Sequence, residues 1–69
     1  MEAIKDIDQH LLCMADPIRG ILEHIHQKEK IVICLPVGGE AAFSKEKTYT
    51  IIRRETSTLF RVHSYHVSS

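Results

Sequence analysis

Apolar residues in the first 27 positions of the chain recur at alternating steps of three and four. The positions are Ile4, Ile7, Leu11, Met14, Ile18, Ile21 and Ile25. This spacing is typical of one face of an α-helix. It continues across Pro17, although proline removes a backbone donor and disfavours helix at the residue before it. Two interpretations stay open: one helix that bends at Pro17, or two helices, the second capped by Asp16.

After residue 30 the pattern changes to a run of uncharged, largely β-branched residues from Ile31 to Val37. In a strand, alternate residues point to opposite faces, and here both faces are apolar. Such a strand is expected to be covered on both sides, yet one helical segment covers only one face of a small sheet. The sequence therefore predicts that a second copy or a foreign partner covers the other face.

Gly38 and Gly39 could form a tight hairpin turn, but that register would place Glu40 among the large aliphatic residues. An irregular loop that runs to about Lys47, with Phe43 folded back as an anchor, avoids this conflict. We favour the irregular loop.

Two further strands are predicted, at residues 48–54 and 59–67, because both segments are rich in β-branched and aromatic residues. A loop of even length between them would place Tyr49 and Ile51 on the same face as Phe60 and Val62. That face is expected to pack on the helix. The predicted fold is therefore a single α+β domain over residues 1–69, with an N-terminal helical segment, kinked or split at Pro17, on a three-stranded antiparallel β-meander.

The size of the chain strengthens the expectation of a partner. A chain of 69 residues buries only about 60% of the surface that its unfolded form exposes. Domains of this size commonly depend on disulfides, a metal or a second subunit. Cys13 and Cys34 are the only two cysteines, too few for a disulfide framework, so we expect them to be reduced. The free thiols, the acidic N-terminus and the absence of a long apolar run predict a cytoplasmic protein without a membrane partner.

Histidine and cysteine are the residues to weigh for a metal site. The candidates are His10, Cys13, His24, His26, His63 and His66. His10 and Cys13 are three residues apart on one face of the predicted helix, but the other histidines are scattered and zinc usually needs four converging ligands. We therefore predict no metal and no cofactor. Cys34 lies in the most apolar segment, where a thiol is a poor nucleophile, so we do not expect an enzyme.

Basic residues near the C-terminus form the one candidate patch for an anion or nucleic acid. Under the even-loop register it would consist of Arg54, Arg61, His63 and Tyr65, with Arg53 on the opposite face. The alternative is a solvated strand face whose arginines deter edge pairing. Nine basic residues are balanced by nine acidic ones, so the chain lacks the positive excess that supports nucleic-acid binding.

The stretch MADPIRGILEHI, residues 14–25, resembles the early helix of ArsR-type winged-helix repressors. That resemblance implies a helix of a dimeric core, and we do not carry the function of the family over to this chain. It covers twelve residues. Beyond them a predicted strand stands where the family has its helix-turn-helix.

Taken together, these patterns predict a small non-catalytic protein-interaction module. We expect a homo-oligomer that acts as adaptor, inhibitor or antagonist of a larger protein, of the kind encoded by phage or bacterial accessory genes. The residues expected at the interface are Val32, Cys34, Pro36, Phe43, Ile52 and Leu59. The alternatives are a nucleic-acid-binding transcriptional regulator and an oligomeric binder of a small anionic ligand.

Overall fold

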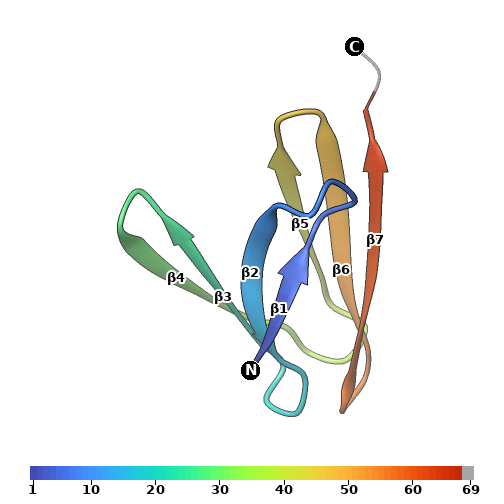
Figure 1. The fold of residues 1–69 in the computed structure, drawn as a ribbon. Coiled ribbons are helices and arrows are strands. Elements are labelled where there is room, and N and C mark those ends of the chain that lie inside the picture. Colours follow the sequence, from blue (N-terminus) through green and yellow to red (C-terminus); the bar gives the residue numbers. More distant parts are fainter. Residues whose placement is uncertain (68–69) are drawn as a thin grey trace.

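Two antiparallel β-sheets make up the protein (Figure 1). The computed structural model describes residues 1–67. Its strands are β1 (Glu2–Lys5), β2 (Leu11–Asp16), β3 (Ile21–His26), β4 (Glu29–Cys34), β5 (Glu40–Lys45), β6 (Thr48–Thr56) and β7 (Leu59–His66). The first sheet has the order β1-β2-β3-β4 and the second the order β5-β6-β7. Nothing in residues 1–67 is helical, so none of it forms a helix that could cross a membrane.

The α+β prediction is therefore wrong: this is an all-β fold. Residues 1–27, predicted as a helical segment bent or split at Pro17, form three strands instead. The segment from Asp16 to Gly20 is a tight turn, in which the Gly20 amide donates to the Asp16 carbonyl at 2.8 Å. Gly20 has a φ of 70°, which favours glycine. The stretch that resembles the ArsR-type helix is thus β2, this turn and β3, so the resemblance does not extend to structure.

The turn between β3 and β4 is another place where the chain departs from a helix. His26 pairs with Glu29, which leaves Gln27 and Lys28 as the two turn residues. Both have positive φ, 50° and 69°, as in the hairpin turns whose twist matches that of the flanking strands. This hairpin pairs Glu29–Cys34 with β3 rather than with β5. The predicted irregular hairpin from Gly38 to Lys47 is consequently wrong as well.

Residues Pro36–Gly39 connect the two sheets. The Gly39 amide donates to the Pro36 carbonyl at 2.8 Å, and the Gly38 amide donates to the backbone carbonyl of Arg54 at 2.7 Å. After this connection β5 pairs with β6 without interruption, from Glu40 opposite Arg53 to Lys45 opposite Thr48.

The strands predicted at 48–54 and 59–67 are present, but their faces are not as predicted. An irregularity at Glu55, between the Arg54–Phe60 and Thr56–Leu59 pairs, inserts one extra residue. Such a bulge reverses which residues share a face. Tyr49 and Ile51 therefore lie opposite Tyr65 and His63 on the outer face, while Phe60 and Val62 lie on the inner face with Arg54 and Ile52.

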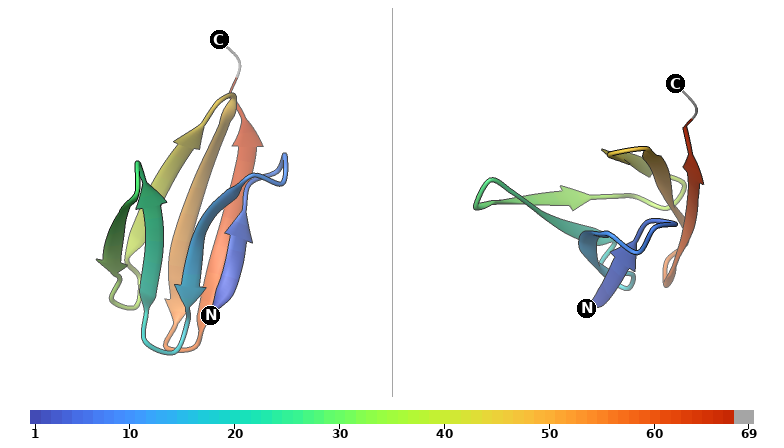
Figure 2. Two further views of the ribbon diagram at one scale, coloured as in Figure 1. Left: turned by 60° about the vertical axis from the view of Figure 1, so that its left-hand side comes forward. Right: turned by 45° about the horizontal axis from the view of Figure 1, so that its top comes forward.

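Both sheets contribute to one core. The buried apolar residues are Ile4, Leu12, Cys13, Ala15, Leu22, Leu35 and Ile52, with Ile33, Ala41, Phe43 and Phe60 packed around them. Burial of this kind stabilises the fold by roughly 25 cal/mol for each Å² of apolar surface. The turn end of the β3–β4 hairpin points away from the second sheet (Figure 2). The two sheets therefore diverge at this end of the hairpin.

Arg54 holds the sheets together at one end of β6. Its guanidinium donates to the carbonyls of Leu35 at 3.0 Å and of Ile18 and Ser57 at 3.1 Å. These acceptors lie in three separate connections, so one side chain fixes all of them. Gly20 lies against this group: a Cβ there would be 2.6 Å from the Leu35 carbonyl oxygen.

Asp6 joins the two sheets at the other end of β6. Its buried carboxylate accepts hydrogen bonds from the backbone amides of Asp8 and His10, the His10 ring and the Thr48 hydroxyl, at 2.7–3.0 Å. Burial alone would raise the pKa of Asp6, but the bonds from Thr48, His10 and Asp8 outweigh it and hold that pKa well below its ordinary value. The loop between β1 and β2 is thereby tied to β6.

Candidate functional site

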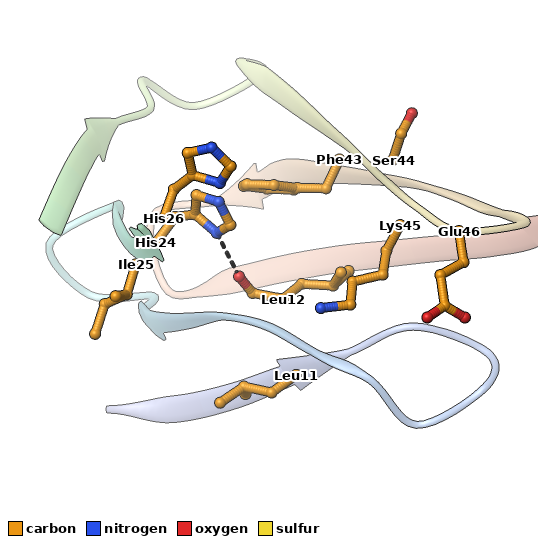
Figure 3. Close-up of a pocket in the computed structure, with 9 residues that line it drawn as sticks. All are labelled: Leu11, Leu12, His24, Ile25, His26, Phe43, Ser44, Lys45 and Glu46. Atoms are coloured by element: carbon orange, nitrogen blue, oxygen red, sulfur yellow. Dashed lines mark hydrogen bonds between the residues drawn. The ribbon is translucent and has the colours of Figure 1, made fainter. Parts of the chain in front are cut away.

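A pocket of about 360 Å³ opens between the two sheets, where β2 and β3 face β5 (Figure 3). It is lined by Leu11, Leu12, His24, Ile25, His26, Phe43, Ser44, Lys45 and Glu46. Its lining includes His24, Ile25 and His26 at the end of β3 that leads into the β3–β4 turn, and this hairpin diverges from the second sheet (Figure 2). Its volume is within the range of small-molecule sites, about 300–1,000 Å³.

The two histidines of the pocket come from one strand. His24 and His26 are two residues apart in β3, so their side chains point to the same face. Their rings are stacked, with centroids 6.1 Å apart and planes at 19°. The ring of Phe43 on β5 lies 5.2 Å from that of His24. Figure 3 shows the three rings gathered on one side of the pocket.

The orientation of His24 is fixed by a hydrogen bond. Its Nδ1 lies 2.7 Å from the carbonyl oxygen of Leu12. A carbonyl oxygen can only accept, so Nδ1 carries the hydrogen and donates. Nε2 is therefore the ring nitrogen that remains for a ligand, as an acceptor in the neutral ring or a donor in the protonated one.

Lys45 and Glu46 stand at the end of β5. Lys45 shares the inner face of β5 with Phe43, because these residues lie opposite Thr48 and Thr50 of β6, which are buried. Among residues 1–67 the Lys45 amino group makes no ion pair, and in Figure 3 its side chain extends toward Leu12. Glu46 lies 3.7 Å from His10 Nε2, away from the two pocket histidines.

The cysteines do not contribute to this pocket. Both are free; Cys13 is buried and Cys34 is exposed. Burial raises the pKa of the Cys13 thiol to about 11, so it stays protonated at neutral pH and is a poor nucleophile or metal ligand. Within residues 1–67 no group of three or more His, Cys, Asp or Glu side chains could hold a metal ion.

The residues predicted at an interface are dispersed. Val32, Cys34 and Pro36 lie exposed on β4 and just after it, and Leu59 is exposed at the start of β7. Ile52 is fully buried in the core, and Phe43 faces the pocket. Ile52 is therefore inaccessible to a partner.

The residues predicted as an anion patch are divided between two faces. Arg61, His63 and Tyr65 share the outer face of β7, where the Tyr65 ring is 5.4 Å from His63 and 5.7 Å from Tyr49. Arg61 is paired with Glu55 at 3.0 Å. Arg54 points inward with Ile52 and donates to three carbonyls, whereas the bulge at Glu55 places Arg61, His63 and Tyr65 on the opposite face.

Lys45 and Glu46 were not singled out from the sequence, and the two histidines were weighed only as metal ligands. The available signal was the His-x-His spacing in an alternating segment, which places both rings on one face of a strand. Comparisons with known protein families, curated proteins and solved structures found no match to this chain.

Proposed function

We propose that the chain is a non-catalytic protein-interaction module that pairs with a second copy of itself through β4. The supporting observation is the exposure of this strand, which is the free edge of the first sheet. All of its residues are exposed except Ile33, which is half-buried. Val32 is 52% exposed and Ile31 is 43% exposed, so apolar side chains border an edge with unpaired backbone groups.

β4 lacks the features that usually protect an edge strand. Natural edges carry central charges, prolines or bulges that prevent pairing with another chain. The only charges of β4 are Glu29 and Lys30 at its start, and its pairing with β3 is regular throughout. The remaining stretch, Ile31 to Cys34, is uncharged and extended, which suits the addition of another strand.

A second copy fits this edge better than an arbitrary strand. Antiparallel pairing about a two-fold axis at Val32 would place Ile31 opposite Ile33 and Lys30 opposite Cys34. No like charges then face each other across the junction, and the uncharged stretch pairs with itself. The two sheets would continue as one.

The biological role of such a dimer is proposed from the small size of the chain, 69 residues. A paired module of this kind would act as adaptor, inhibitor or antagonist of a larger protein. We place it in the cytoplasm, because both of its cysteines are free and reducing compartments keep thiols in that state.

The test is the oligomeric state of Val32→Asp. The substitution puts a charge at the centre of the proposed junction, so we expect the wild type to sediment as a dimer and the variant as a monomer. The variant should keep a β-sheet circular dichroism spectrum and a cooperative melt, because the side chain is exposed in the single chain. The matched control is Ile18→Asp, since Ile18 is also apolar and exposed but lies in a turn.

A monomeric wild type at micromolar concentration would contradict the proposal. So would a Val32→Asp variant that remains dimeric, or an Ile18→Asp variant that dissociates equally.

A further inference from the structure

The pocket between β3 and β5 has two kinds of wall. Apolar side chains from both sheets, Leu11, Leu12, Ile25 and Phe43, form one part of its lining, and nitrogen-bearing side chains, His24, His26 and Lys45, form another. A cavity that combines apolar surface with a few placed polar groups is the usual form of a small-molecule site. The lining of the pocket therefore suits a ligand with an apolar body and a polar end.

The polar side chains of the pocket favour a ligand whose polar end is negatively charged. Lys45 is a cation without an ion-pair partner among residues 1–67. His24 donates from Nδ1 to the Leu12 carbonyl, and this bond fixes the orientation of its ring in the pocket. His26, stacked on His24, adds a second ring of the same chemistry.

The one acidic residue of the lining does not neutralise this group. Glu46 lies 3.7 Å from His10 Nε2, and His10 also binds Asp6 at 3.0 Å. The Glu46 carboxylate is thus directed toward the Asp6 loop, as Figure 3 shows by its position apart from the three rings. It still lies on the pocket rim, where it would repel a ligand with more than one negative charge.

We propose that this pocket binds a small organic monocarboxylate, with the carboxylate at Lys45 and its aliphatic or aromatic body against Phe43, Leu12 and the stacked rings of His24 and His26. A charge-assisted bond to an ammonium group is stronger than one between neutral groups. The rings of His24 and Phe43, with centroids 5.2 Å apart, add aromatic surface to this wall of the pocket. Inorganic phosphate fits less well, because a large part of it is doubly charged at neutral pH and because it leaves the apolar wall uncovered.

The site is independent of the proposed dimer. It lies between β3 and β5, whereas the self-association uses the free edge of β4. A monomeric Val32→Asp variant is therefore expected to bind the same ligands, so the two proposals can fail separately.

The first test uses benzoate as the probe and follows backbone and histidine side-chain signals by NMR. We expect saturable shifts at His24, His26, Phe43 and Lys45, with millimolar affinity or better. Benzyl alcohol, which has the ring but no charge, should bind at least about fivefold more weakly, the loss expected for one partly exposed ion pair. Inorganic phosphate should bind more weakly than benzoate.

The second test separates this site from general surface charge. Lys45→Gln should weaken benzoate binding about fivefold, while Lys47→Gln should not. Both lysines are exposed and lie at the same turn, but only Lys45 lines the pocket. His26→Gln, compared with His63→Gln on the outer face, provides a second pair of exposed positions.

Three results would overturn the proposal: no saturable benzoate shifts at the pocket, equal affinity for benzyl alcohol or phosphate, or equal losses from Lys45→Gln and Lys47→Gln. Benzoate binding that weakens only in the Lys45 and His26 variants would support it.

Discussion

Strands β4 and β6 differ in burial in a way that their residue types do not explain. β4 contains Ile31, Val32 and Ile33, yet Val32 is 52% exposed. β6 contains Thr48 and Thr50, yet these polar residues are buried, and Thr50 is 0% exposed. The difference is position: β6 is paired on both sides and faces the first sheet, whereas β4 is an edge on the diverging side of the molecule.

The buried threonines show what central placement requires. Thr48 donates to Asp6 at 2.7 Å, and Thr50 donates to Ser64 at 2.9 Å. A buried hydroxyl without a partner would cost about 1–3 kcal/mol, so these bonds make burial tolerable and also join β6 to its surroundings. β4 has no comparable anchors, and its exposed apolar side chains are what the proposed second copy would cover.

The largest expected effect is the loss of stability when a buried residue of β6, rather than an exposed residue of β4, is truncated. Ile52→Ala should lower the free energy of unfolding by about 2–5 kcal/mol, because Ile52 is fully buried in the shared core. Val32→Ala should lower it by less than about 1 kcal/mol, since the side chain is exposed. Urea denaturation of both variants at a concentration where the chain is monomeric measures the difference. Equal losses would mean that β4 is buried within the single chain.

The next prediction concerns the Arg54 anchor at the end of β6. Gly20 and Gly38 both have positive φ, 70° and 87°, so alanine is strained at either site by about 1 kcal/mol. A Cβ at Gly20 also meets the Arg54 side chain and the Leu35 carbonyl, whereas a Cβ at Gly38 meets nothing within 4 Å. Gly20→Ala should therefore lower the thermal midpoint clearly more than Gly38→Ala. A larger drop for Gly38→Ala would contradict the packing of Arg54.

The mildest change tests the anchor at the start of β6. Because the pKa of Asp6 is lower in the folded chain than its ordinary value of 3.8, its ionised form stabilises the fold above that pH. This contribution is lost as the pH falls below about 3.8. Asp6→Asn keeps an oxygen acceptor but does not titrate, so its thermal midpoint should fall less between pH 5 and pH 2 than that of the wild type. Parallel pH profiles would show that Asp6 does not anchor β6.

The all-β fold could have been predicted from turn signals in the sequence. Polar or turn-forming segments recur about every ten residues, near residues 6–10, 16–20 and 26–29, a spacing typical of antiparallel sheets. The spacing of apolar residues in positions 1–27 resembled that of a helix because β1, β2 and β3 have only four to six residues each. So short a strand does not establish a period of two, and each turn restarts the alternation. Gln27 and Lys28 adopt the left-handed conformation, but neither is a glycine, so the sequence did not mark this turn.

The pocket could be predicted only in part. The His-x-His spacing of β3 places two rings on one face once that segment is taken as a strand. Phe43 and Lys45 join them because the chain returns through Pro36–Gly39 and places β5 opposite β3. A contact between segments about twenty residues apart depends on how the sheets stack, which no local pattern records.

The sequence alone determined where β6 and β7 begin, the balance of charge, and the presence of an uncharged segment at Ile31 to Val37. Local propensities and turn residues are sufficient for those features, since they depend on near neighbours. Only the tertiary structure decided that Thr50 is buried and Val32 exposed, and that a bulge at Glu55 places Arg61 on the face opposite Arg54. Burial is a property of what lies across the sheet and above it, so the same residue type is core in one strand and surface in another.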